Sequence, residues 1–253
     1  MSAVQPSTVA RVVWSPVVDR PAVRALLDES ERARYAALWA PGDRARFAAG
    51  RALAKSVLGR LTGLPAGSLR LSRTCRLCGG PHGGPQLAGS GYRFSLSHAG
   101  DFVVLAVCDR GSPGVDVEQP GRRDFARLAG RVLSRAEARD FSALPAGLLD
   151  WAGCRYWTRK EALLKATGHG LSLPMREITV TRPGRAAALL DWTGRYEASE
   201  FFLADVGAGH ISAGIAALAV HGNPDVEVTE FSVADPLADP PDFRGPGRRR
   251  ASG

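Results

Sequence analysis

Two stretches decide the fold of this chain: GVDVE at residues 114–118 and WTRKEALLK at residues 157–165. In the first stretch, apolar and acidic residues alternate, which predicts a strand with Asp116 and Glu118 on one face and its valines on the other. Two carboxylates on one face repel each other unless a cation lies between them, and a few carboxylates with substrate phosphates are the usual ligands of Mg²⁺. The alternative is an ordinary solvated face of an edge strand.

The second stretch belongs to a helix that we expect over residues 149–167. Trp157, Glu161 and Lys165 recur every four residues and therefore line one side of it, with Lys160 on the neighbouring stripe. An exposed Glu–Lys pair at this spacing stabilises a helix by only about 0.2–0.5 kcal/mol. The tryptophan on the same stripe indicates instead a partly buried side, where charges need partners.

The rest of the chain alternates helical and strand-like segments in two broadly similar halves, without an exact internal repeat. Strands are expected at residues 9–14, 92–97, 102–108, 114–118, 177–181, 200–206 and 211–220. Helical segments are expected at residues 21–39, 43–61 and 149–167. Asp43 is expected to cap the second of these segments, and a capping box of Ser134 and Glu137 is expected to begin a further helix. We predict an α+β fold with an N-terminal half over residues 1–111, a C-terminal half over residues 112–222 and a disordered tail over residues 235–253.

Charge is distributed unevenly along the 253 residues. The first 170 carry 25 basic and 14 acidic side chains, a net charge of +11, whereas the whole chain has +8. This favours a polyanionic partner, either a phosphate-rich small molecule, a nucleic acid or an acidic protein, unless the arginines are simply solvated. Only three lysines occur among the 33 basic residues: Lys55, Lys160 and Lys165.

Composition also predicts a compartment. No apolar run reaches about 18 residues, so we expect no membrane span. The first residues show no secretory signal, and four cysteines in a chain of this length do not form a disulfide scaffold. A reduced, cytoplasmic protein is therefore expected.

Two further groups of side chains are candidates for binding or catalysis. Ser97 and His98 end a strand before a glycine and can donate hydrogen bonds to a phosphate, whereas adjacent strand residues face opposite ways and make a poor catalytic dyad. The spacing of Cys75 and Cys78 with His82 resembles half of a zinc site, but no second ligand pair follows, so a pair of loop thiols is the favoured interpretation. No P-loop or Rossmann glycine motif is present.

Four motifs occur together in a fixed order: FSLSHAG (94–100), GVDVE (114–118), WTRKEALLK (157–165) and GHGLSLP (168–174). In this order they resemble the 4′-phosphopantetheinyl transferases of the larger, surfactin-synthetase-activating type, over roughly residues 9–221. The resemblance implies two similar α+β halves around a pseudo-twofold axis, with the active site at their interface. It also implies a monomer that transfers phosphopantetheine from coenzyme A to a serine of an acyl or peptidyl carrier domain, releasing 3′,5′-ADP.

The resemblance assigns roles to individual residues. It implies that Asp116, Glu118 and Glu161 place Mg²⁺ on the pyrophosphate, that Glu161 (or a water that it holds) is the base with Glu118 as the other candidate, and that Lys165 stabilises or protonates the departing phosphate. Ser97 and His98 match phosphate contacts, Arg46 matches the arginine that holds the 3′-phosphate, and Arg34, Arg51 and Lys160 are further candidate coenzyme A contacts.

The sequence departs from the family pattern at two positions. Gly84 stands where a basic residue is often found, so one phosphate contact is missing or is replaced by a nearby arginine. Glu31 stands where a basic residue is frequent in some members, which weakens the case for Arg32 and Arg34 as ligands. Neither departure affects the three acidic residues Asp116, Glu118 and Glu161, which we call the acidic trio.

The partners implied are coenzyme A and an acidic carrier domain of polyketide, non-ribosomal peptide or fatty-acid biosynthesis, without nucleic acid or membrane. A basic nucleic-acid-binding protein is the alternative that the charge suggests, although few aromatics are interleaved with the arginines. A metal-dependent phosphohydrolase that uses the same carboxylates is a third hypothesis. Which carrier is modified stays open.

Overall fold

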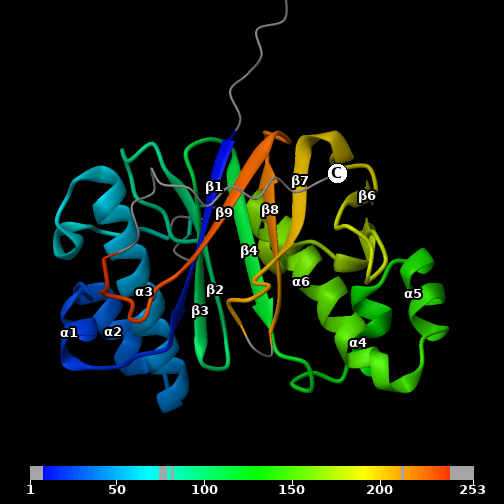
Figure 1. Cartoon of the computed structure of the whole chain (residues 1–253), viewed down its shortest axis with the longest axis horizontal. Helices are drawn as coiled ribbons and strands as arrows, with labels where there is room; N and C mark the ends of the chain where they lie inside the picture. The colour runs from blue at the N-terminus through cyan, green and yellow to red at the C-terminus, as the bar shows by residue number, and fades with distance from the viewer. Residues whose placement is uncertain (1–7, 74–78, 81–82, 212–213, 240–253) are drawn as a thin grey trace, which may run out of the picture.

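The structure is a computed structural model that describes residues 8–73, 79–80, 83–211 and 214–239. Helices α1–α3 flank the central strands on one side and α4–α6 on the other (Figure 1). The elements in chain order are β1 (Thr8–Pro16), α1 (Pro21–Ala25), α2 (Glu29–Ala37), α3 (Pro41–Thr62), β2 (Arg93–Ala99), β3 (Phe102–Cys108), β4 (Ser112–Glu118), α4 (Phe125–Val132), α5 (Arg135–Ser142), α6 (Leu149–Thr167), β5 (Ile178–Val180), β6 (Leu189–Trp192), β7 (Phe201–Val206), β8 (Ile215–His221) and β9 (Val226–Ser232). Helices beside largely antiparallel strands confirm the α+β fold class. Among the described residues, no helix is both long and apolar enough to cross a membrane.

Two sheets form the centre of the molecule. The first has the strand order β2-β3-β1-β9 and the second the order β4-β8-β7, while β5 and β6 form a separate pair. In the first sheet, Trp14 of β1 lies opposite Val104 of the antiparallel β3 and opposite Ser232 of the parallel β9. The chain therefore leaves the first sheet after β3, builds the second sheet, and returns to the first.

The two sheets meet along β2 and β4. Ser95 Oγ of β2 accepts a hydrogen bond of 3.1 Å from the backbone N–H of Val115 in β4. Val115 and Val117 pack into a buried cluster together with Trp14 of β1. Since side chains alternate along a strand, Asp116 then faces away from this cluster, as the sequence predicts.

Helix α6 lies directly on β4 because Gly114 has no side chain. A Cβ atom at Gly114 would lie 1.9 Å from the backbone oxygen of Ala162 and 2.5 Å from the nitrogen of Ala166. No Cβ atom tolerates such distances, so the close approach of helix and strand requires glycine at this position. This contact sets the distance between the acidic strand and the charged side of α6.

Several local predictions are confirmed and two are corrected. Helix α6 has the predicted bounds, and Ser134 and Glu137 form the predicted capping box of α5. The helical segment expected over 21–39 is interrupted, because Asp28 starts a new helix with its own capping box. Asp43 does not cap α3, which begins two residues earlier at a proline, and lies in the first turn instead.

The C-terminal part of the chain packs against the N-terminal half. Strand β9 was not expected, and the residues that follow it contribute an ion pair of 2.8 Å between Asp235 and Arg20. Leu237 packs against a cluster that includes Val23 and Leu27. The described residues 235–239 are thus part of the fold, while residues 240–253 of the expected tail lie outside the described residues.

Candidate active site

Asp116 of β4 is the residue on which three elements converge. Its Oδ1 accepts hydrogen bonds from Lys165 Nζ of α6 at 2.7 Å and from Ser97 Oγ of β2 at 2.8 Å. Lys165 Nζ also donates to Ser97 Oγ at 3.2 Å and to the backbone oxygen of Val115 at 3.0 Å. The structure therefore brings together three residues that lie in three separate motifs of the sequence.

The other carboxylate oxygen of Asp116 has no partner. Asp116 is only 5% exposed, and its Oδ2 is buried without a hydrogen bond from any described residue. Burying a charged oxygen without a compensating donor or cation is costly, so such an atom marks a position where a ligand is favoured.

Glu161 lies on the same side of α6 as Lys165. Its side chain is 7% exposed, and burial together with the negative charge of Asp116 raises the pKa of Glu161 to about 7. Glu118 adds to this rise, whereas Lys165 opposes it. At neutral pH both protonation states of Glu161 are therefore populated, which is the condition that suits a general acid or base.

Glu118 is held by a residue that the sequence did not single out. Arg123 donates to Glu118 Oε1 from Nε at 3.0 Å and from Nη2 at 2.6 Å, and its guanidinium lies 4.4 Å from the ring centroid of Trp157. Burial and the charge of Asp116 raise the pKa of Glu118, and the hydrogen bond from Arg123 lowers it. Trp157 is half-buried, which confirms that the charged stripe of α6 is partly covered.

The three carboxylates of Asp116, Glu118 and Glu161 are the candidate ligands of a metal ion. Within the described part of the chain, no three His, Cys, Asp or Glu side chains converge as a ready metal site. Glu118 is turned to Arg123 and Asp116 Oδ1 to Lys165, yet Asp116 Oδ2 remains unpaired. Burial and the charge of Asp116 raise the pKa values of both Glu118 and Glu161. Carboxylate oxygens in one small region match the hard oxygen ligands of Mg²⁺, so the donor set fits once Glu118 leaves Arg123.

His98 and Arg46 extend the site towards the N-terminal half. His98 has an exposed ring, but the surrounding protein and the charges of Arg46 and Lys165 lower the pKa of His98. Arg46 Nη2 binds Asp43 at 2.6 Å, and Arg46 Nη1 lies 3.4 Å from the backbone oxygen of Gly100 in the β2–β3 turn. The charges of Arg46 and Lys165 therefore both act at His98, which suits an anion bound beside it.

A second group of arginines surrounds Phe47 of α3. The guanidinium carbons of Arg34 and Arg51 lie 6.0 and 5.3 Å from the ring centroid of Phe47. Arg51 is 6% exposed, its Nη1 is buried without a partner, and its Nε lies 3.6 Å from Glu31 Oε1. Burial lowers the pKa of Arg51, and the charges of Arg73 and Arg34 lower it further. Like charges held together around an unpaired donor are an arrangement that an anion stabilises.

Lys160 corrects a sequence prediction. It is fully buried, and its Nζ donates to Glu137, to the backbone oxygen of Val132 at 2.7 Å and to that of Met175 at 3.1 Å. All three N–H groups are therefore used inside the C-terminal half. Lys160 does not reach a bound coenzyme A, because the neighbouring stripe of the helix points into the core rather than along the charged side.

Arg123 and Arg73 are candidate site residues that the sequence did not single out. Arg73 Nε donates to the backbone oxygen of Gly83 at 3.0 Å, which places a basic side chain beside Gly84. A Cβ atom at Gly84 would meet nothing within 4 Å. The absence of a basic residue at position 84 is a sequence signal that could have pointed to Arg73 as its replacement. No sequence pattern predicts that Arg123 pairs with Glu118. The thiol group of Cys75 and Cys78 with His82 lies outside the described residues.

A hollow of about 650 Å³ lies elsewhere, beside the start of α5. Arg135, Arg176 and Arg195 line it together with Glu177. None of the predicted site residues takes part, so this hollow is separate from the carboxylate site.

Comparison with known proteins identifies relatives of the chain. A family profile described as the 4′-phosphopantetheinyl transferase superfamily matches residues 112–217. The chain is 33% identical over 192 residues to the 4′-phosphopantetheinyl transferase HetI of Nostoc sp., an alignment that covers 72% of this chain and 79% of HetI. It is 29% identical over 174 residues to the putative 4′-phosphopantetheinyl transferase slr0495 of Synechocystis sp., covering 66% of this chain and 68% of that protein.

A solved structure, the holo-[acyl-carrier-protein] synthase of Thermotoga maritima, is 22% identical with a TM-score of 0.35 and covers 44% of this chain and 63% of its own. The extended similarity to HetI and the profile match over the segment that holds Asp116 and Lys165 lead to one conclusion. The chain belongs to the 4′-phosphopantetheinyl transferase superfamily.

Proposed function

We propose that this protein transfers the 4′-phosphopantetheine group of coenzyme A to a serine hydroxyl of an acyl or peptidyl carrier domain and releases 3′,5′-ADP. Family membership supports the reaction class, and one observation supports its location. Asp116 contacts Lys165 and Ser97 through one carboxylate oxygen, and its second oxygen is buried and unpaired. This group of side chains lies beside Glu161. The larger, surfactin-synthetase-activating type remains part of this proposal.

The roles of the chain's own residues follow from their charges. The carrier serine loses its proton to Glu161, or to a water that Glu161 holds, because a pKa of about 7 leaves part of this carboxylate ionised at neutral pH. The serine oxygen bonds to the phosphorus that carries pantetheine, and the bond from that phosphorus to the 3′,5′-ADP oxygen breaks. Lys165 stabilises the negative charge that develops on the departing phosphate. Glu118 is the second candidate base.

Asp116, Glu118 and Glu161 would hold Mg²⁺ in the working enzyme. A metal ion bound there would neutralise charge on the pyrophosphate oxygens. Binding requires Glu118 to exchange its hydrogen bonds with Arg123 for the metal, and the unpaired Asp116 Oδ2 is available as a ligand.

The phosphates of coenzyme A meet basic and hydroxyl groups of both halves. We assign Ser97 and His98 to the pyrophosphate. The 3′-phosphate is assigned to the arginine-rich region of the N-terminal half, which contains Arg46, Arg34, Arg51 and, as a new member, Arg73. Fixed guanidinium groups bind phosphate oxygens in pairs, which supports this use of arginine.

The carrier and the setting complete the proposal. An acidic carrier domain suits the net charge of +11 over the first 170 residues. The domain boundaries at residues 111 and 112, a monomeric state and a cytoplasmic location also belong to the proposal.

Carrier modification is the direct test. The protein is incubated with coenzyme A, Mg²⁺ and several apo carrier domains, and intact-mass spectrometry follows the addition of one phosphopantetheine group while chromatography follows 3′,5′-ADP. We expect at least one carrier to be modified, and Asp116→Asn to lose the activity. Carriers that stay unmodified here, while a characterised transferase modifies them, would contradict the proposal.

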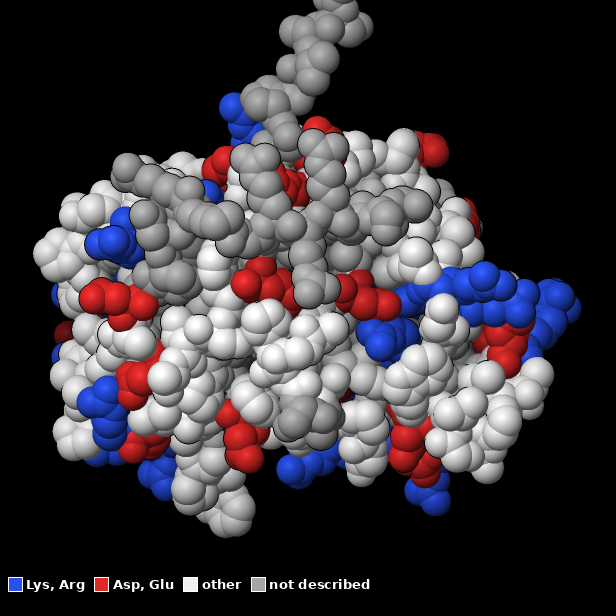
Figure 2. All heavy atoms as spheres, viewed as in Figure 1, with Lys and Arg blue, Asp and Glu red and all other residues white. Residues whose placement is uncertain are grey.

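The two alternative functions predict different results. Cleavage of coenzyme A without any carrier would support a phosphohydrolase. Nucleic-acid binding predicts retardation of a DNA or RNA fragment at low salt that disappears as salt is added. On the face in Figure 2, acidic side chains lie across the middle and basic ones lie at both ends and along the lower edge, interspersed with further acidic ones, so this face has no continuous basic surface.

A further inference from the structure

Two of the three lysines, Lys160 and Lys55, are completely buried, and each contacts a glutamate that caps the start of a helix. Lys160 of α6 contacts Glu137, which is the third residue of α5 and caps the backbone N–H of Ser134 at 2.7 Å. The carbonyl that completes the contact belongs to Val132, just before this cap. A buried ammonium thus ties the long helix α6 to the first turn of α5.

Lys55 of α3 repeats this arrangement in the N-terminal half. Its Nζ donates to Glu31 Oε2 at 2.6 Å and to the backbone oxygen of Leu26 at 2.8 Å. Glu31 is again the third residue of its helix, α2, and caps the backbone N–H of Asp28 at 3.1 Å. The same three parts are present: a buried lysine, a capping-box glutamate and a carbonyl before the cap.

The chain spacing of the parts is also conserved between the halves. The lysine follows its glutamate by 24 residues in the first half and by 23 in the second, and it follows its carbonyl by 29 and 28 residues. Sequence alone did not reveal this repeat, because the cap is Asp28 in one half and Ser134 in the other. The repeat therefore lies in the side-chain contacts rather than in a recognisable motif.

Such a contact fixes the rotation of a helix about its axis. Each residue advances an α-helix by about 100°, so a small rotation would draw the ammonium away from acceptors that it needs when buried. On α6, the next residue after Lys160 is Glu161, and Lys165 lies one turn further. On α3, Arg51 lies about one turn and Arg46 about two and a half turns before Lys55.

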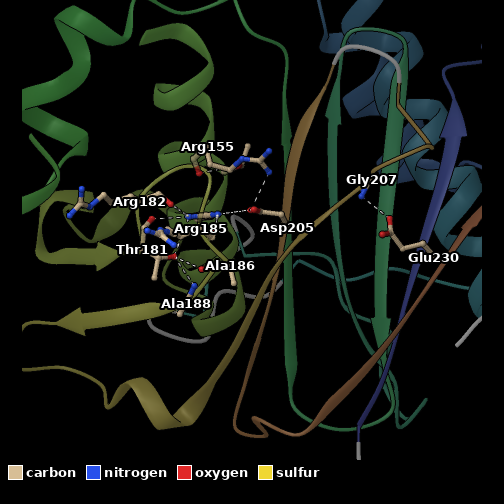
Figure 3. A network of polar contacts seen from close by, with 11 residues as sticks. Arg155, Thr181, Arg182, Arg185, Ala186, Ala188, Asp205, Gly207 and Glu230 are labelled. Atoms are coloured by element: carbon tan, nitrogen blue, oxygen red, sulfur yellow. Dashed lines mark hydrogen bonds and ion pairs between the residues drawn. The ribbon is translucent and has the colours of Figure 1, made fainter. Parts of the chain in front are cut away.

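Other contacts hold α6 in place independently of Lys160. Arg159, also fully buried, donates to both oxygens of Asp205 at 2.9 and 2.7 Å and to the backbone oxygen of Thr181 at 2.7 Å. Figure 3 shows Asp205 between Arg155 and the turn that contains Thr181 and Arg185. Removing the Lys160 contact should therefore alter the orientation of α6 without detaching the helix.

We propose that Lys160 and Lys55 are positioning residues with separate duties: Lys160 orients Glu161 and Lys165 for the transfer step, and Lys55 orients the arginines of α3 for coenzyme A binding. This inference rests on the proposed function. Neither lysine touches substrate, because both are fully buried.

The test uses the same substitution in each half as a matched pair, Lys160→Met and Lys55→Met. Methionine has a similar length and no charge. Lys160→Met should lower kcat by about tenfold or more and change KM for coenzyme A by less than about twofold. Lys55→Met should raise KM for coenzyme A by about fivefold or more and leave kcat within about twofold.

A purely structural role would change kcat and KM alike in both variants, and folded variants with that behaviour would overturn the proposal. If either methionine variant does not fold, Lys160→Arg and Lys55→Arg keep the charge but place a larger planar group in the site, and the same split should appear at smaller amplitude. Arginine variants without the split would overturn it equally.

A readout that does not depend on activity separates this inference from the proposed function. Transfer by the wild type tests the proposed function by itself. Amide hydrogen exchange of the folded variants should rise around residues 161–165 in the Lys160 variant and around residues 46–51 in the Lys55 variant, each without the other. A rise spread evenly over both helices would contradict separate positioning roles.

Discussion

The ammonium of Lys165 lies 2.7 Å from Asp116 Oδ1, and Oδ2 of the same carboxylate is buried without a partner. One oxygen is thus neutralised by the protein, and the other is left for a ligand. The same lysine also donates a hydrogen bond to Ser97 of β2, so a rearrangement at Asp116 would change contacts on both β2 and α6.

Substituting Lys165 tests whether a compact ammonium is required. Lys165→Arg keeps the charge, but a guanidinium cannot give up a proton to a departing phosphate and does not fit three acceptors around one nitrogen. We expect kcat to fall by about tenfold or more while coenzyme A binding, measured by calorimetry, changes little. Unchanged turnover would mean that positive charge alone is sufficient.

The raised pKa of Glu161 predicts a pH-dependent stability. In the unfolded chain this carboxyl titrates near 4.5, and in the fold near 7. Folding favours the neutral form of this carboxyl. Its contribution to the free energy of unfolding is therefore complete below pH 4.5 and is lost as the pH rises through 7, which lowers the free energy of unfolding by about 3 kcal/mol. Glu161→Gln should therefore be more stable than wild type at pH 8 without metal.

Thermal unfolding at two pH values checks this expectation. At pH 8 the Tm of Glu161→Gln should exceed that of the metal-free wild type by several degrees, and at pH 5 the two should be close, since about 1 kcal/mol shifts Tm by about 2–4 °C at this size. An equal difference at both pH values would refute the shifted pKa.

Arg123 would compete with a metal ion for Glu118 if the proposed Mg²⁺ site forms. Arg123→Gln removes both hydrogen bonds to Glu118 Oε1 and frees this carboxylate. We expect the Mg²⁺ concentration for half-maximal activity to fall by about threefold or more, because the metal no longer displaces a cation. Arg122→Gln, at the exposed neighbouring position, is the control and should not change it. A higher Mg²⁺ requirement in Arg123→Gln would show that Arg123 supports the metal site.

Gly114 determines how closely α6 approaches β4. In Gly114→Ala the new Cβ would lie 1.9 Å from the backbone oxygen of Ala162, so the helix must move. We expect a loss of about 2–4 kcal/mol in unfolding free energy, measured by urea denaturation. Gly130→Ala is the matched control, since a Cβ there meets nothing within 4 Å, and it should be neutral or slightly stabilising. Comparable losses in both variants would refute the close-contact explanation.

Arg73 lies beside Gly84, so we expect a lysine at Gly84 to supply part of the charge that Arg73 provides. Arg73→Ala should raise KM for coenzyme A by about threefold or more, and adding Gly84→Lys should restore part of the affinity, because a side chain at Gly84 has open space. Arg70→Ala, an exposed arginine near the same loop, is the control. If the added lysine has no effect, the loop does not face the bound phosphates.

The sequence determined those features of the site that depend on backbone period. Strand alternation put Asp116 and Val115 on opposite faces, and the four-residue helical spacing put Trp157, Glu161 and Lys165 on one side. The capping box of α5 was readable because Ser134 and Glu137 are only three residues apart. In each case the geometry follows from local hydrogen bonding of the backbone, which neighbouring residues specify.

Only the tertiary structure decided which side chains meet across long stretches of chain. Lys160 shares a motif with Glu161, yet it faces the core because Glu137, 23 residues earlier, lies there to receive it. Arg123 reaches Glu118 through a turn that no periodic pattern describes, and β9 returns to pair with β1 after more than two hundred residues. Such partners are selected by the packing of the whole fold, because a buried charge is stable only where the final structure supplies its counter-charge.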